Sequence, residues 1–165
     1  MDSFEGGKEG YLARLDLSTG KKVALPVSDP QRADVSPDER WLDFYVEKDR
    51  YHRDIFVSRL ESQPVPKEQW ILIAENVAGV KAIGWSPQGG FLYWFSDVDG
   101  RDCLYGRPLD AATKRPTGPA VLVQHLHQRA RIATYYDLPM LFNSDQLLLP
   151  LTESYSTIWM RKLVE

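Results

Sequence analysis

Residues 35–40 read Val-Ser-Pro-Asp-Glu-Arg, and residues 85–90, fifty positions later, read Trp-Ser-Pro-Gln-Gly-Gly. The same offset aligns the apolar runs that follow, so that Leu42 matches Leu92 and Phe44 matches Trp94. Similar spacings relate three further segments, Ile55-Phe56 with Leu60, Leu104-Tyr105 with Leu109, and Ile158-Trp159 with Leu163; a fainter copy is Tyr11 with Leu15. A period near fifty residues indicates repeated structural units.

Ser86 stands in the stretch Gly-Trp-Ser-Pro-Gln-Gly, which resembles the nucleophile elbow of hydrolases, G-x-S-x-G. The second glycine comes one position too late for that motif, and Pro87 follows the serine directly. Serine followed by proline favours a type I turn. Because Ser36-Pro37 repeats the arrangement one unit earlier, we expect Ser86 to form a turn and not to act as a nucleophile.

Each unit consists of short segments rich in aromatic and β-branched residues, which predict strands. The expected strands are 10–16, 21–27, 32–36, 41–46, 54–60, 69–74, 80–85, 91–95, 103–109, 119–124 and 156–163. Several of these runs are apolar at consecutive positions, which indicates sheets covered on both faces. Four strands per unit, repeated at this spacing, describe the four-stranded antiparallel blades of a β-propeller. A β-sandwich also contains many short strands, but it does not predict matching turns every fifty residues.

The predicted fold class is therefore all-β, a single propeller-like domain over residues 1–165 with about three to three and a half blades. Its units are a partial blade at 7–30, complete blades at 31–77 and 78–127, and a final blade at 128–163 without an outer strand. Closed propellers have four to eight blades. Two explanations stay open: the chain belongs to a longer propeller, or two copies pair as a homodimer with six blades.

The repeats resemble those of TolB-type proteins and related WD40-like bacterial β-propellers. That family pattern runs W/V-S-P-D-G, an apolar strand, S-D-x-D-G, then I-Y and a distant leucine. It is matched here by Val35-Ser36-Pro37-Asp38, by Trp85-Ser86-Pro87-Gln88-Gly89 and by Ser96-Asp97-Val98-Asp99-Gly100. The resemblance implies blades that build a scaffold, as in the non-catalytic propellers of prolyl oligopeptidase-like peptidases and the sensor-like regions of bacterial multidomain proteins.

The composition of the 165 residues argues against several classes of partner. The formal net charge of −3 offers no overall basic surface for nucleic acid. No run of about 18 apolar residues predicts a membrane-spanning helix. The first ten residues lack the basic and apolar regions of a signal peptide. Localisation stays open between cytoplasm and periplasm.

No cofactor or metal site is predicted. Cys103 is the one cysteine of the chain, and its strand-like context predicts a small buried side chain. The acidic stretch from Asp97 to Asp102 resembles a calcium loop, but its glycine comes too early and no glutamate closes it. We expect a hairpin turn there.

The stretch from Gln124 to Arg131 carries the strongest sequence signal for ligand binding. If it is extended, His125, His127, Arg129 and Arg131 point to one side, because strand side chains alternate. With Asp137, these residues are the candidate ligand-binding set, at the mouth of a channel, for an anion or an acidic peptide. Two other hypotheses are zinc binding by His125 and His127, and a solvated connection without a ligand.

Asp34 and Asp137 lie in or near expected inner strands, where propeller glycosidases place their acid/base pair. Two carboxylates alone do not make that case, and we expect no catalytic residues. The predicted function is a non-enzymatic propeller module that binds a protein, a peptide or a small ligand, with a protein or peptide as the favoured partner. The alternative is an accessory propeller segment of a peptidase or other hydrolase, or of a bacterial multidomain sensor.

Overall fold

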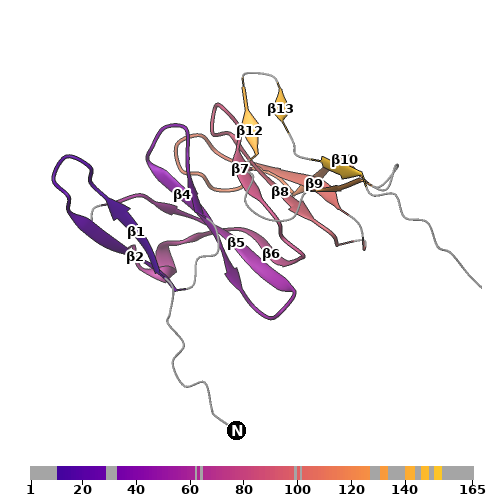
Figure 1. The fold of residues 1–165 in the computed structure, drawn as a ribbon. Helices are drawn as coiled ribbons and strands as arrows, with labels where there is room; N and C mark the ends of the chain where they lie inside the picture. The colour runs from indigo at the N-terminus through magenta and orange to yellow at the C-terminus, as the bar shows by residue number, and fades with distance from the viewer. Residues whose placement is uncertain are drawn as a thin grey trace, which may run out of the picture.

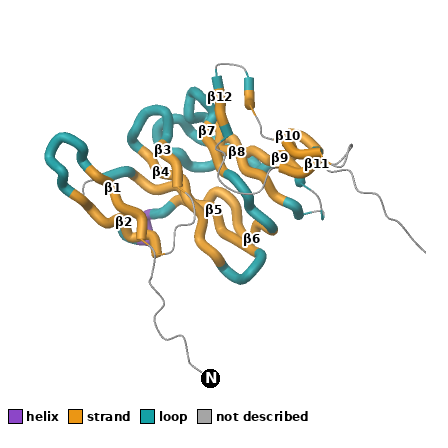
Figure 2. The backbone as a smooth tube through the Cα atoms, viewed as in Figure 1, coloured by secondary structure: helices purple, strands orange, loops and turns teal. Residues whose placement is uncertain are grey.

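The computed structural model describes residues 11–28, 33–61, 63, 65–98, 100, 102–126, 131–133, 140–143, 146–148 and 151–153. Strands account for almost all the regular structure of this part of the chain (Figure 2). One single-turn 3₁₀ helix, η1 (Lys67–Gln69), interrupts them. The predicted all-β fold class is confirmed. In the same residues, no helix is long and apolar enough to cross a lipid bilayer.

Two four-stranded antiparallel sheets form the centre of the molecule (Figure 1). The first sheet, blade 1, contains β3 (Ala33–Val35), β4 (Trp41–Glu47), β5 (His52–Arg59) and β6 (Ile71–Ala78), in that order. The second sheet, blade 2, contains β7 (Ile83–Trp85), β8 (Phe91–Ser96), β9 (Cys103–Pro108) and β10 (Val121–His125). Both follow the chain order from an inner to an outer strand, which is the blade architecture of a β-propeller.

The Ser-Pro turns connect the first two strands of each blade by the same hydrogen bonds. In blade 1, the Ser36 N–H donates to the Trp41 carbonyl at 2.9 Å, and the Ser36 Oγ accepts the Trp41 N–H at 3.0 Å. In blade 2, Ser86 and Phe91 make the same two bonds at 2.9 and 3.0 Å. A buried serine hydroxyl thus satisfies the first N–H of the next strand, and so the motif recurs with the blade.

Short paired strands lie on either side of the two blades. β1 (Tyr11–Leu15) pairs with β2 (Lys22–Ser28), beside blade 1 (Figure 1). β11 (Arg131–Ala133) pairs with β14 (Leu151–Glu153). The hairpin of β12 (Leu141–Phe142) and β13 (Leu147–Leu148) lies between β11 and β14 in the chain.

This hairpin was not predicted, because the third unit has no Ser-Pro turn to mark the connection. Its Phe142 ring stacks on Tyr93 of β8 at 5.2 Å, so it packs against the outer face of blade 2. The expected strand at 156–163 lies outside the described residues. The single-domain assignment and the boundaries of the four units stay predictions.

The main hydrophobic core fills the space between the two blades. Blade 1 contributes Ile55 and Val57, and blade 2 contributes Leu92 and Trp94; the first three of these side chains are fully buried. Strand alternation explains the arrangement, because Leu92 and Trp94 face blade 1 while Tyr93 and Phe95 face the β12–β13 hairpin. Both faces of blade 2 are therefore covered, as the consecutive apolar runs predict.

Candidate binding groove between the two blades

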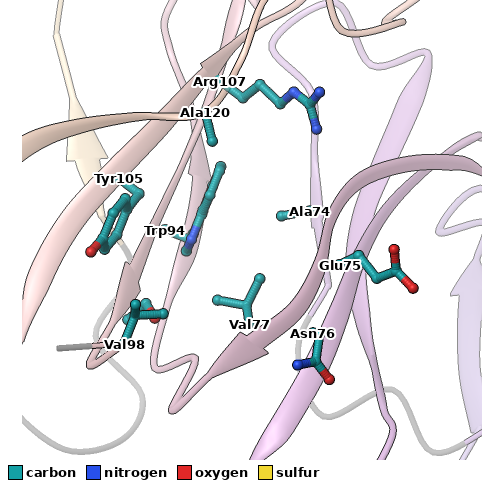
Figure 3. A pocket seen from close by; sticks show the side chains of 10 residues that line it. Ala74, Glu75, Asn76, Val77, Trp94, Val98, Tyr105, Arg107 and Ala120 are labelled. Carbon is teal, nitrogen blue, oxygen red and sulfur yellow. The ribbon is translucent and has the colours of Figure 1, made fainter. Parts of the chain in front are cut away.

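A groove of about 250 Å³ opens between blade 1 and blade 2 (Figure 3). It is lined by Ala74, Glu75, Asn76, Val77, Trp94, Ser96, Val98, Tyr105, Arg107 and Ala120. One wall is the outer strand β6 of blade 1, and the other is the face of β8 and β9 with the loops beside them. We call this cavity the inter-blade groove.

The wall from blade 2 is aromatic. Trp94 on β8 and Tyr105 on β9 are direct cross-strand partners, and their rings stack at 6.2 Å with 15° between planes. Such pairs hold each other in a fixed orientation. Trp94 is buried and Tyr105 is half-buried, so the wall is rigid but its surface remains accessible along Tyr105.

The wall from blade 1 is shaped by a β-bulge. Val77 pairs with Arg53 and Ala74 pairs with Ile55, so β6 has one more residue than β5 over this interval. Asn76 adopts the left-handed region at φ +55°, and its N–H donates to Asp54 Oδ1 at 2.7 Å. Bulges of this kind twist an edge strand and redirect its side chains. Here the bulge brings four consecutive residues, 74 to 77, to the border of the groove.

Charged side chains lie near two parts of the groove. Lys48 Nζ is 3.5 Å from Glu75 Oε1 and 3.7 Å from Asp54 Oδ1, on the bulge side. Arg107 Nε donates to the Gly118 carbonyl at 2.9 Å, and its Nη1 donates to the Ile73 carbonyl of β6. Arg107 thereby links blade 2 to β6 by a hydrogen bond, which holds the two walls of the groove together near Ile73.

The free edge of β6 adds backbone hydrogen-bonding capacity to the groove. In the described part of the chain, β6 pairs with β5 on one side and with no strand on the other. An edge strand presents N–H and C=O groups to an incoming extended segment. The groove can therefore offer an apolar, aromatic surface together with a strand edge.

The predicted ligand-binding set falls mostly outside the described residues. His127, Arg129 and Asp137 lie outside it, and only the backbone of Arg131, the first residue of β11, is described. His125 is exposed at the end of β10, and its Nδ1 lies 3.1 Å from Cys103 Sγ. The stripe of four cationic groups stays a prediction.

Of the two carboxylates considered as an acid/base pair, Asp137 lies outside the described residues, so only Asp34 can be placed. Asp34 is exposed on β3, and its direct partner across the sheet is Asp43 on β4, which is 1% exposed. Desolvation raises the pKa of Asp43 well above its ordinary value, and the nearby Asp34 charge adds to the shift. The apolar neighbours of Asp43 in β4 were a signal for this burial that sequence reasoning did not use.

Other candidates from the sequence have structural roles. Cys103 is buried, as predicted. At the tip of the acidic loop, the Gly100 N–H donates to the Asp97 carbonyl, and Asp97 Oδ1 accepts the Tyr51 hydroxyl at 2.6 Å. The described residues contain no group of three or more metal-ligating side chains.

Neither a protein-family model nor a curated protein matches the chain. Among solved structures, it is similar to the tricorn protease, with 17% identity and a TM-score of 0.45 over 60% of this chain and 12% of that one. It is also similar to a mutant of puromycin hydrolase complexed with PGG, with 16% identity and a TM-score of 0.44 over 68% of this chain and 16% of that one. The chain thus spans only a small part of these proteins, and neither likeness assigns it an activity.

Proposed function

We propose that this chain is a non-enzymatic propeller-type binding module whose inter-blade groove holds one apolar side chain of an extended protein segment. The observation that carries the proposal is the bulged edge of β6 facing a stacked Trp94–Tyr105 wall. Extended peptides commonly bind by adding to a strand edge, with side-chain pockets providing specificity.

The size of the groove supports a side chain as its occupant. Pockets for drug-sized ligands have volumes of roughly 300–1,000 Å³. The inter-blade groove, at about 250 Å³, is smaller than this range and is open to solvent along Val98 and Ala120. One large apolar residue of a longer segment suits it better than a cofactor does.

The charges near the groove favour a peptide over a purely apolar ligand. Glu75 and Asn76 are exposed at the bulge, and Arg107 is half-buried at the other part of the groove. Polar groups at the rim of an apolar site fix the orientation of a bound chain. A segment with an apolar central residue and polar neighbours therefore matches the groove.

Titration of the ¹⁵N-labelled chain with short peptides tests this function. The peptides differ only at a central position, occupied by Trp, Leu or Ala, in an otherwise polar β-prone sequence. We expect the Trp and Leu peptides to shift the amide signals of residues 74–77 and Val98, and the Ala peptide to shift them far less. Equal shifts for all three peptides, or none, would contradict the proposal.

Val98→Glu provides the matching variant, because Val98 is 60% exposed and lines the groove. It should abolish peptide binding with little effect on folding. Leu17→Glu is the control, since Leu17 is 91% exposed in the β1–β2 turn, outside the groove. It should leave the peptide affinity unchanged.

The TolB-like character of the module and the alternative of an accessory propeller segment of a hydrolase stay predictions. The serines of the Ser-Pro turns support the non-enzymatic proposal, because each hydroxyl accepts a backbone N–H in its turn.

A further inference from the structure

We propose that a second cavity, on the other face of blade 2, binds one uncharged sugar ring. We call it the hairpin cavity, because the β12–β13 hairpin forms one of its walls. It shares no described lining residue with the inter-blade groove, so the proposal does not depend on what the groove binds. The ring is either a free monosaccharide or the end of a longer glycan.

Three segments enclose the hairpin cavity, which has a volume of about 250 Å³. The floor is the face of β8, β9 and β10 that carries Tyr93, Leu104 and Val123. The other walls are the Ser-Pro turn at residues 86–88 and the β12–β13 hairpin. Pockets for drug-sized ligands have volumes of roughly 300–1,000 Å³, so this smaller cavity suits a ligand of a single ring.

The apolar part of the cavity is a fixed aromatic surface. Tyr93 stacks on Phe142 of the hairpin at 5.2 Å between ring centres, and on Phe91 at 5.7 Å. The direct partner of Tyr93 across the sheet is Gly106, where a Cβ would lie 2.9 Å from the tyrosine ring. The missing side chain at Gly106 thus gives the ring room to lie against β9. Aromatic rings held in this way offer a flat apolar surface to a ligand.

The corresponding face of blade 1 is packed as core. It contacts Leu92 and Trp94 of blade 2, and Val57 occupies the position that Gly106 has in blade 2. Over blade 2, the facing hairpin contributes polar side chains, Asn143 and Gln146, beside its apolar ones. The space over this face therefore stays partly open and is polar at its rim.

The hydroxyl of Ser86 is a hydrogen-bond donor without an acceptor among the described residues. In blade 1, the Ser36 hydroxyl donates to Asp38 Oδ1 at 2.6 Å. The counterpart of Asp38 is Gln88, and no bond between it and the Ser86 hydroxyl is found in the described part of the chain, while Ser86 Oγ still accepts the Phe91 N–H. Ser86 is 9% exposed and lines the cavity. A buried donor of this kind favours an oxygen atom of a ligand as its partner.

Amide side chains lie at the opening of the cavity. Gln88 and Gln146 are both exposed there. Gln146 Oε1 accepts the Asn143 Nδ2 N–H at 3.2 Å, which orients the Gln146 side chain at the end of the hairpin. An amide offers both a donor and an acceptor, and a hydroxyl group also donates and accepts. The rim of the cavity therefore matches a ligand with several hydroxyl groups.

The charge of the cavity narrows the class of ligand. No charged side chain is among the described residues that line it. A phosphate, carboxylate or ammonium group would lose hydration there without gaining a counter-charge. A pyranose ring fits these conditions, because its C–H groups form an apolar face for Tyr93 and Phe142 while its hydroxyls lie around the edge, within reach of the amides.

Titration of the ¹⁵N-labelled full chain with uncharged sugars tests the proposal. Glucose, galactose, mannose and N-acetylglucosamine are each added as the free sugar and as the methyl glycoside. We expect at least one to shift the side-chain amide signals of Gln88 and Gln146 and to leave residues 74–77 unchanged. Equal binding of the free sugar and its glycoside would assign the site to a glycan end, and binding of the free sugar alone to a monosaccharide.

Charged analogues test the class of ligand. The uronate and the amino sugar of the series that binds should bind at least about tenfold more weakly than the neutral sugar, because the cavity offers no counter-charge. Binding of a charged analogue as tight as that of the neutral sugar would overturn the proposal. Shifts caused by uridine but by no sugar would also overturn it, since the flat surface would then hold a nucleobase.

Gln88→Leu is the main variant, and it should weaken sugar binding about tenfold through the loss of amide hydrogen bonds. Gln69→Leu is the matched control, because Gln69 is also exposed but lies in η1, outside the cavity. Val123→Trp fills the floor of the cavity from an exposed position and should abolish binding. Backbone amide spectra show that each variant keeps its fold. No shift with any sugar, or equal weakening by Gln88→Leu and Gln69→Leu, would overturn the proposal.

Discussion

The carboxyl group of Asp43 is buried in the core between the blades. Its Oδ1 accepts the Asp34 N–H at 2.9 Å, and no partner for Oδ2 is found among the described residues. Burial raises its pKa, so the folded state holds a proton that the unfolded chain releases near its ordinary value of 3.8. Stability from this group is thus present below that pH and is lost as pH rises towards the folded pKa.

Asp43→Asn should therefore increase the free energy of unfolding at neutral pH, by about 1–3 kcal/mol, because no ionisation remains to be suppressed. The difference from wild type should shrink as pH falls towards 4. Urea denaturation between pH 4 and 8 measures it. A wild-type stability that rises over this range, with the rise abolished by Asp43→Asn, would reverse the assignment.

Asp16 serves as a control for Asp43, because its pKa is shifted in the opposite direction. Hydrogen bonds from the Ser18 hydroxyl and from the Thr19 and Ser18 N–H groups lower its pKa to about 2. Its contribution is present above its ordinary pKa and is lost as pH falls towards 2. Asp16→Asn should destabilise the protein at neutral pH, and the difference should disappear in acid.

Ser36 and Ser86 should both stabilise their turns, and the Ser36 hydroxyl also donates to Asp38 Oδ1 at 2.6 Å. Ser36→Ala and Ser86→Ala each leave a strand N–H without its acceptor, and each should cost about 1–3 kcal/mol of unfolding free energy. Thr117→Ala, at an exposed position, should change it by less than about 0.5 kcal/mol. A fluorophosphonate probe should label neither serine; labelling lost only in Ser86→Ala would identify a nucleophile instead.

Lys114, in the loop after β9, lies close to the Ser-Pro turns of both blades. This lysine is 1% exposed, and its Nζ donates to the Gly89 carbonyl at 2.9 Å. The same ammonium lies 3.8 Å from Asp38 Oδ2 and 5.6 Å from the centre of the Trp85 ring. One side chain from the loop after β9 therefore contacts the Ser-Pro turns of both blades.

Gly89→Ala tests this junction. Gly89 has φ +64°, and a Cβ there would lie 2.8 Å from Lys114 Nζ. The left-handed conformation alone should cost about 1–2 kcal/mol in a residue with a Cβ. Gly90→Ala is the matched control, because a Cβ at Gly90 meets nothing within 4 Å. Thermal unfolding of the two variants compares them, and an equal loss in both would contradict this role for Gly89.

The core between the blades makes them depend on one another. Leu92 on β8 is fully buried in the same cluster as Val57 and Ile55 of β5. Their contact surface belongs to both sheets, so removing side-chain volume from one sheet leaves a cavity against the other.

Leu92→Ala should lower the unfolding free energy by about 2–5 kcal/mol. Native-state hydrogen exchange should show the loss in β4 and β5 as well as in β8 and β9. Leu148→Ala, at a position that is 67% exposed, is the control and should leave protection unchanged in both blades. Protection lost in blade 2 alone would mean that the blades unfold separately.

Sequence spacing predicted most strands closely, since the expected strand 91–95 is observed as β8 (Phe91–Ser96). It missed β11 to β14, and among the strands that it did predict it was least accurate at β6, expected at 69–74 and observed as Ile71–Ala78, because the bulge at Asn76 depends on the Asp54 carboxylate of the neighbouring strand. The sequence did not predict the inter-blade groove, because its two walls come from separate repeats.

The linear order of residues was enough to establish the blade repeat and the Ser-Pro turns, because alternation and turn chemistry act between near neighbours in the chain. It could not establish the burial of Asp43, the contact of Lys114 with Gly89, or the groove beside β6. Each of these depends on the free energy of bringing together residues from different strands or repeats, and that closeness exists only once the sheets have packed.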